Sequence, residues 1–172
     1  MKIFMIRHGK ADYSYGDSHN FIGHGHDLAP LNKDFIEDVI KTSQDDRLKE
    51  ATLIVSSPYT RALQTAAIIS RETGLEIAIE PDLREWEPDL TYQYKCGEIK
   101  EYYRDYQNNN GILPMDREVN WESKAHLKNR VESVIEKYKD FDSIIFVFHQ
   151  MAIQAVTGID KIKPAEIIEF TL

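Results

Sequence analysis

Arginine and histidine residues follow three apolar runs of this sequence, and together they could bind and transfer an anionic group. Arg7 and His8 follow the first run directly, Arg61 follows the second by a few residues, and His149 follows the third directly. Guanidinium groups suit bidentate contacts to phosphate or carboxylate oxygens, and a neutral imidazole can act as a nucleophile. Each residue alone also fits a plainer role, as a salt-bridging cation or a hydrogen-bonded core histidine. Their joint occurrence after apolar runs favours an anion site.

Arg61 gives the most specific signal, because of its place in a predicted helix. Ser57 and Pro58 have the residue types of an N-cap and a first helical position, so Arg61 would lie in or beside the first turn. A cation there meets the positive end of the helix dipole, which is unfavourable by ~0.3 to 1 kcal/mol unless an anion is shared. We therefore expect an anion beside Arg61.

The three apolar runs are predicted to be buried parallel strands. They cover residues 2–7, 51–57 and 143–149, and each is short, β-branched or aromatic, and apolar without clean alternation. Apolar stripes at helical spacing lie between them, which indicates an α/β protein: a three-layer α/β/α sandwich with a mostly parallel central sheet and helices on both faces. In such sheets ligands bind at the carboxyl ends of the strands, so the sequence predicts that the polar residues converge there.

The helices are predicted from three apolar stripes, within residues 35–40, 62–69 and 127–138. Gly74 and Gly158 follow helical patterns and are predicted to end them, since glycine accepts the left-handed conformation common after a helix. The sequence therefore predicts where two of the helices end.

We expect one domain over residues 1–172, with an insertion or lid at about 86–121. Tyrosines are frequent in this insertion, and residues 98–106 suggest a short helix with Tyr103 and Tyr106 on one side. Loops that carry specificity usually lie on a rigid scaffold, so we expect the insertion to cover one end of the sheet. The final segment, residues 166–172, is predicted to be an edge strand.

Composition excludes several classes of partner. The net charge of −8 argues against nucleic acid and anionic membranes, which are held mainly by clustered Lys and Arg. The single cysteine, Cys96, rules out an intramolecular disulfide and suits a reducing compartment. The N-terminus does not read as a secretory signal, and the apolar run at 144–148 is far shorter than the roughly 20 residues that span a bilayer. We expect a cytoplasmic protein, of undetermined oligomeric state.

Four landmarks in order along the chain resemble the histidine phosphatase superfamily, the phosphoglycerate mutase-like fold. They are RHG (7–9), SSPYTRALQTA (56–66), LRE (83–85) and FVFHQ (146–150). The segment ESKAHLKNRV (122–131) is also similar to the family's helix before the last core strand, where a Glu-Ser pair precedes an arginine. The resemblance covers the chain from Arg7 to His149.

The resemblance implies a covalent mechanism with neither metal nor cofactor. His8 would be the nucleophile that accepts the phosphoryl group, and Arg7, Arg61 and His149 would surround the phosphate oxygens. Glu85 would protonate the leaving oxygen and then help to activate water. Physical chemistry is consistent with these roles, because phosphoryl transfer depends on positioning and on stabilising charge over the equatorial oxygens. Nearby guanidinium groups would keep His8 neutral, and Gly9 would let the chain turn close to the phosphate.

Four positions depart from the family's pattern. Lys10 and Ala11 stand where many members have Glu-Thr, and Ser14 replaces an asparagine that often helps to bind phosphate. Ser14 is thus a candidate phosphate ligand. Gln150 replaces the small residue that commonly follows the second histidine, and it could narrow the phosphate pocket or add an amide donor. These departures bear on the substrate, and less on activity.

The segment GHGHD (23–27) allows an alternative metal reading, because His24, His26 and Asp27 are possible ligands. The remaining ligands have no evident source, so we favour a loop and expect no metal site. Glu85 also has alternatives, since Asp82 and Glu87 are nearby acids.

The reaction predicted from these features is hydrolysis of a small phosphomonoester through a phosphohistidine on His8. The modest insertion favours a phosphatase over a phosphoglycerate mutase-type phosphotransferase, because such mutases tend to have larger insertions that enclose the site. A phosphoprotein phosphatase and a non-catalytic phosphate-binding protein remain alternatives.

Overall fold

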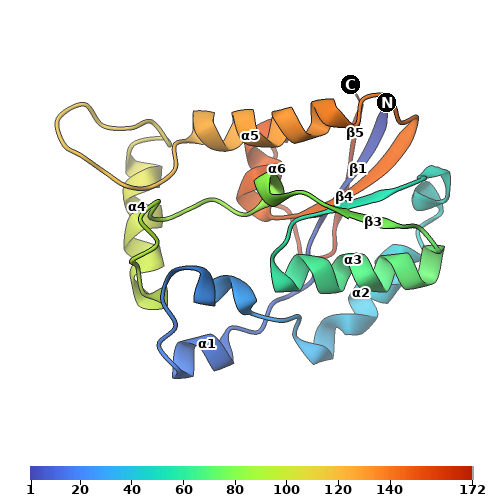
Figure 1. Cartoon of the computed structure of the whole chain (residues 1–172), viewed down its shortest axis with the longest axis horizontal. Coiled ribbons are helices and arrows are strands. Elements are labelled where there is room, and N and C mark those ends of the chain that lie inside the picture. Colours follow the sequence, from blue (N-terminus) through green and yellow to red (C-terminus); the bar gives the residue numbers. More distant parts are fainter. Residues whose placement is uncertain (172) are drawn as a thin grey trace.

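A five-stranded sheet forms the centre of the molecule (Figure 1). The computed structural model describes residues 1–171, apart from the side chain of Cys96; Leu172, at the end of the predicted final strand, lies outside the described residues. The strand order is β3-β2-β4-β1-β5, and only β5 runs antiparallel to its neighbour. The strands are β1 (Lys2–Arg7), β2 (Ile54–Ser56), β3 (Ile77–Ile79), β4 (Ser143–Phe148) and β5 (Ile167–Thr171).

Helices cover both faces of this sheet, which confirms the α/β prediction (Figure 1). Helices α2 and α3 lie on one side, α5 and α6 lie on the other, and α4 lies beyond one end of the sheet. None of the described helices is both long enough and apolar enough to cross a membrane. The α-helices are α1 (Ser14–Ser18), α2 (Ile36–Ser43), α3 (Thr60–Thr73), α4 (Ile99–Asn108), α5 (Lys124–Lys137) and α6 (Gln150–Thr157). Short 3-10 turns cover Gly23–Leu28, Lys33–Phe35, Asp46–Glu50, Pro81–Leu83 and Cys96–Glu98.

The apolar runs of β1 and β4 are continuous because both faces of these strands are buried. Phe4 and Ile6 pack in one apolar cluster with residues of α2 and α3. Ile3 and Met5, which point to the other face, pack in a second cluster with residues of α5 and α6. The central strands are therefore fixed on both sides, which makes their carboxyl ends rigid supports.

The ends of the helices agree with the sequence in two places and disagree in one. Gly74 and Gly158 follow α3 and α6 in the left-handed conformation, with φ of 75° and 74°. The prediction that Ser57 caps α3 and that Pro58 begins it is wrong, since α3 begins at Thr60 after an extended Tyr59. The Ser57 hydroxyl bonds instead to His149 Nε2, across the strand ends, at 2.7 Å.

Two strands differ from the predicted ranges. The prediction over 51–57 is realised only as the short β2, and β3 was not predicted at all. Strand β3 is an edge strand of two half-buried residues and one exposed residue, so it lacks the strong apolar signal of the central strands. The predicted final strand is confirmed as edge strand β5.

Candidate active site

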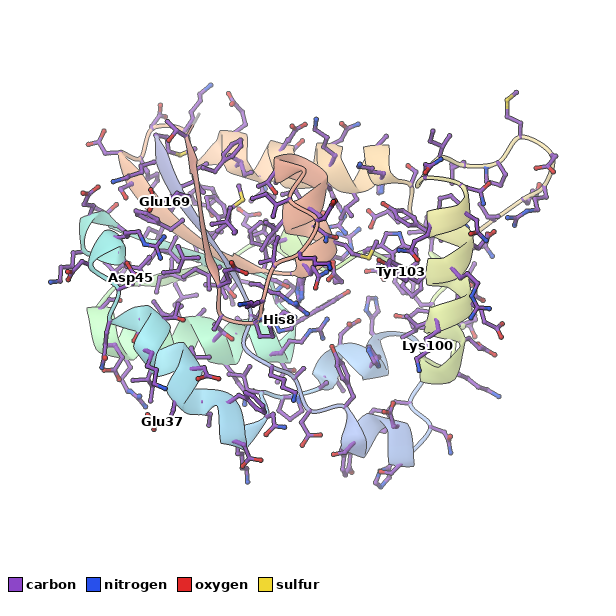
Figure 2. The ribbon with its side chains drawn as sticks, turned by 180° about the vertical axis from the view of Figure 1, so that it is seen from behind. His8, Glu37, Asp45, Lys100, Tyr103 and Glu169 are labelled. Atoms are coloured by element: carbon purple, nitrogen blue, oxygen red, sulfur yellow. The ribbon has the colours of Figure 1, made fainter. Side chains whose placement is uncertain are left out.

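The carboxyl ends of β1 and β4 bring two histidines together, and Figure 2 shows His8 in the middle of the molecule. His8 directly follows β1, and its backbone N–H donates to the Phe148 carbonyl at 2.9 Å. His149 directly follows β4, and the centroids of the two imidazole rings lie 5.0 Å apart. Arg61, the second residue of α3, reaches the same place, with its Nε 3.3 Å from His8 Nε2. The predicted convergence at the strand ends is therefore present.

The contacts of His8 define which of its nitrogens is free to react. Nδ1 lies 2.6 Å from the carbonyl oxygen of Gly9, and because a carbonyl can only accept, Nδ1 carries the proton. Nε2 therefore holds a lone pair, which accepts from Arg61. Burial and the positive charge of Arg61 lower the pKa of His8 to about 3. His8 is thus a neutral imidazole at ordinary pH, with the lone pair on Nε2.

Gly9 follows His8 and packs closely against α2 and α3. Its N–H donates to Thr65 Oγ1 on α3 at 3.0 Å. A Cβ built on Gly9 would lie 2.7 Å from Val39 Cγ2, closer than side chains pack. Only a residue without a side chain fits here without movement of α2.

His149 is held by Ser57, which follows β2. His149 Nε2 lies 2.7 Å from Ser57 Oγ, and the same Oγ accepts from the Tyr59 N–H at 3.3 Å. The serine hydroxyl can donate its proton to Nε2, and in the tautomer that this bond favours His149 Nδ1 carries the ring proton. His149 is completely buried, and burial together with Arg61 lowers its pKa well below the usual range.

Arg61 is buried and is surrounded by aromatic rings and one carboxylate. Its guanidinium carbon lies 5.1 Å from the ring centroid of Tyr59 and 5.8 Å from that of Tyr13. Asp27 Oδ1 lies 3.6 Å from Arg61 Nη1, an ion pair longer than a hydrogen bond. The cation is therefore oriented but only partly neutralised.

Three buried donors of this cluster have no hydrogen-bond acceptor. Among the described residues, four buried side-chain polar atoms are left without a partner, and three of these are Arg7 Nε, Arg61 Nη1 and His149 Nδ1. Arg7 is anchored on its other side, where Nη1 donates to the Ile162 carbonyl at 2.6 Å. An unsatisfied buried donor costs about 1–3 kcal/mol, and more when charged. An anion with several oxygens is what these donors lack.

Glu85 lies beside the cluster, with both carboxyl oxygens turned to backbone donors. Oε1 accepts from the Trp86 N–H at 2.9 Å, and Oε2 lies 3.4 Å from the Met151 N–H at the start of α6. Burial raises the pKa of Glu85 even though these N–H groups and Arg61 oppose the rise. A carboxyl group with a raised pKa can carry a proton for transfer.

The neighbouring acids are occupied elsewhere. Glu87 is buried, accepts from the Tyr59 hydroxyl at 2.9 Å and pairs with Arg84 Nε at 3.2 Å. Asp82 pairs with Arg84 at 2.8 Å near the surface. Of the three acids considered from the sequence, Glu85 is the one with contacts at the start of α6, next to His149.

Arg130 of α5, which forms a buried ion pair with Glu122, fixes the segment that carries Glu85. Arg130 binds both oxygens of Glu122, at 2.7 and 2.8 Å. The same guanidinium donates to the carbonyl oxygens of Asp82, Arg84 and Glu85, at 2.7–2.8 Å. One side chain thus holds the backbone before and at Glu85 in place.

Some predicted residues lie outside the cluster. Ser14 begins α1, is exposed, and its backbone N–H donates to Asp12 Oδ1 at 3.0 Å; its role as a phosphate ligand stays a prediction. His26 stacks on Tyr13, and His24 Nδ1 lies 3.1 Å from Asp27 Oδ2. Within the part of the chain that the structure describes, no group of three or more His, Cys, Asp or Glu side chains could hold a metal ion.

Three residues of the cluster carry no direct signal in the sequence. The residue types predict a helix cap for Ser57 and, at most, a metal ligand for Asp27. Tyr59, which lies 5.1 Å from the His149 ring, was not singled out. Only the run of side chains just after β2 could have indicated Ser57 and Tyr59, because residues after parallel strands face the ligand crevice.

Comparisons with known proteins agree with this fold. A mycobacterial glucosyl-3-phosphoglycerate phosphatase superposes with a TM-score of 0.74 at 17% identity, covering 99% of this chain and 89% of its own. A putative alpha-ribazole-5'-P phosphatase from Escherichia coli gives 0.64 at 21% identity, covering 90% and 76%. A search of curated proteins found no match. A family model described as histidine phosphatase superfamily (branch 1) matches residues 3–171, and the chain therefore belongs to the histidine phosphatase superfamily.

Proposed function

We propose that this protein is a phosphatase that hydrolyses a small phosphomonoester through a phosphohistidine on Nε2 of His8. The observation that carries the proposal is the set of three buried donors without acceptors beside a neutral imidazole. The three donors, on Arg7, Arg61 and His149, match the three non-bridging oxygens of a phosphate ester. Phosphatases among the similar structures support the reaction class.

In the first step, the lone pair of His8 Nε2 forms a bond to phosphorus while the bond from phosphorus to the ester oxygen breaks. The leaving oxygen takes the proton of Glu85, so an alcohol departs and Glu85 becomes a carboxylate. Arg61 Nε gives up its contact with Nε2 and, with the three free donors, binds the equatorial oxygens. The Gly9 carbonyl stabilises the charge that develops on the ring by accepting from Nδ1.

In the second step, the Glu85 carboxylate takes a proton from water as the water oxygen bonds to phosphorus. The bond between phosphorus and Nε2 breaks, and its electron pair returns to His8. Inorganic phosphate leaves, and Glu85 is again protonated. The raised pKa of Glu85 suits both halves of this exchange, since one group must give and take the same proton.

The remaining features of the proposal rest on the sequence. Two guanidinium groups supply the positive charge that phosphoryl transfer needs, so activity is expected without an added metal or cofactor. We treat residues 1–172 as one domain with an insertion at 86–121, acting in the cytoplasm. Ser14 remains a candidate phosphate ligand.

The test is to trap the intermediate. Protein mixed with 32P-labelled acetyl phosphate or phenyl phosphate and quenched in alkaline denaturant should retain acid-labile label, and the variant His8→Asn should retain none. Turnover in 18O-labelled water should place 18O in the released phosphate, whereas a mutase would return the phosphoryl group to the substrate. Label that persists in His8→Asn, or turnover that a chelator abolishes, would contradict the mechanism. A binding protein without turnover would give no released phosphate.

A further inference from the structure

A cleft lies between α4 and α6, next to the cluster but outside it. It has a volume of about 460 Å³, and side chains from α4, from the start of α5 and from α6 line it. We refer to it as the α4–α6 cleft. Its walls include Tyr103, Tyr106, Lys124, Met151, Gln154 and Asp160. Tyr103 lies on the side of α4 that faces the middle of the molecule, where His8 lies (Figure 2).

The cleft adjoins Glu85 through two of its walls. Met151, which lines the cleft, directs its backbone N–H toward Glu85 Oε2 at 3.4 Å. On the opposite wall, the ring of Tyr106 contacts Trp86, the residue after Glu85, at 5.0 Å between centroids. In the proposed reaction Glu85 gives its proton to the leaving oxygen, so the alcohol must lie on this side of the phosphate. The α4–α6 cleft is placed to receive it.

The lining of the cleft indicates what kind of alcohol fits. Tyr103 accepts from the Gln107 amide at 3.0 Å, so its own O–H proton remains available for a ligand. The Gln154 amide nitrogen donates to the Asp160 carbonyl, which leaves the Gln154 carbonyl oxygen as an acceptor. The tyrosine rings add flat apolar faces that pack against C–H groups. Closely spaced hydroxyl groups on a carbon chain match this mixture of donors, acceptors and ring faces.

The charges of the cleft argue against an ionic alcohol. Lys124 and Asp160 are the charged side chains among its lining residues, and they are opposite in sign. A carboxylate on the leaving alcohol would meet both, so it would gain little net attraction. An uncharged group needs no such compensation.

We infer that the α4–α6 cleft binds the alcohol portion of the substrate, and that this alcohol is an uncharged polyhydroxylated group of the sugar or sugar-alcohol class. The inference rests on the proposed phosphatase function and specifies its substrate class. Tyr103 and Gln154 are the specificity-determining residues.

The test compares substrates that differ only in hydroxyl groups. Sorbitol 6-phosphate and n-hexyl phosphate have leaving groups of the same chain length, and phosphate release measures kcat/KM for each. Each hydrogen bond gained is worth about a two- to tenfold change, so sorbitol 6-phosphate should be favoured by about tenfold or more. Equal values, or a preference for hexyl phosphate or phenyl phosphate, would overturn the inference while leaving the phosphatase proposal intact. No turnover of any of these esters would contradict both.

Variants locate the preference in the cleft. Tyr103→Phe removes one exposed hydroxyl, and should lower the ratio of the two kcat/KM values by about two- to tenfold, mainly through a higher KM for sorbitol 6-phosphate. Tyr138→Phe is the matched control, because its hydroxyl bonds to Glu80 instead of lining the cleft. Asp160→Asn should raise kcat/KM for the anionic 6-phosphogluconate relative to sorbitol 6-phosphate. Unchanged ratios in Tyr103→Phe and Asp160→Asn would place the alcohol elsewhere and overturn the inference.

Discussion

Replacing Arg130 by methionine tests whether one buried side chain holds the segment that carries Glu85. The change removes five hydrogen bonds that the structure shows, two to Glu122 and three to the carbonyl oxygens of Asp82, Arg84 and Glu85. Glu122 is fully buried and would lose its guanidinium partner, keeping only the contacts to His126 Nδ1 at 2.8 Å and to the Glu87 N–H at 3.2 Å. Breaking a buried pair in this way costs about 3–5 kcal/mol of unfolding free energy. For a chain of this length that lowers the melting temperature by about 6–20 °C.

The assay is thermal and urea unfolding of the variant beside a matched control. Arg47→Met is that control, because Arg47 also makes two hydrogen bonds to one carboxylate, that of Asp45, but at the surface. Its loss should cost about 1 kcal/mol at most. If Arg130→Met were no more destabilising than Arg47→Met, the reasoning from burial would be refuted.

A second measurement separates the ion pair from the carbonyl contacts. In the double variant Glu122→Leu, Arg130→Met no buried charge remains, so it should be more stable than Arg130→Met alone. The pH dependence gives a further check. Burial opposes ionisation of Glu122, but the hydrogen bonds from Arg130 outweigh it and hold the pKa of Glu122 below its ordinary value of 4.5. The pair's contribution is therefore full above about pH 4.5 and is lost as the pH falls through the lower, folded-state pKa, and Arg130→Met should remove this dependence.

Two further outcomes are expected at the site. The value of kcat/KM for phenyl phosphate should rise as the pH increases through the His8 pKa of about 3, because the nucleophile must be neutral. It should fall again as the pH passes the raised pKa of Glu85, because the general acid then loses its proton. Glu85→Gln should remove the fall at high pH; a fall that persists would assign it to another group. Gly9→Ala should lower the free energy of unfolding in urea by about 1–3 kcal/mol, because the new Cβ would lie 2.7 Å from Val39 Cγ2. An unchanged urea midpoint would show that α2 moves away at no cost in stability.

The positions of Arg7, His8 and His149 were predictable because β1 and β4 are buried on both faces. Such strands appear in the sequence as continuous apolar runs, and polar residues directly after them must lie at the same edge of the sheet. The match of β1 and β4 in register, with Arg7 opposite Phe148, places both histidines side by side. The apolar runs and the common edge of parallel strand ends are enough to place these three residues.

The contacts of Asp27 and Ser57 were not predictable by the same means. Asp27 reaches Arg61 through a long connection after β1 whose path depends on tertiary packing and not on a repeating pattern. Ser57 has the residue type of a helix cap, and local preference alone cannot show that His149 takes its hydroxyl instead. Strand β3 was missed for a related reason, since two half-buried residues and one exposed residue carry little periodic signal.

The three buried donors on Arg7, Arg61 and His149 also affect the stability of the ligand-free protein. Each lacks a hydrogen-bond acceptor, so these atoms lower the stability of the ligand-free protein. Product phosphate should have the opposite effect on the native protein, raising its melting temperature in proportion to the logarithm of phosphate concentration once binding saturates. In the proposed reaction the same atoms that bind the phosphoryl group lower the stability of the ligand-free protein, and product phosphate would restore part of that stability while it competes with the substrate.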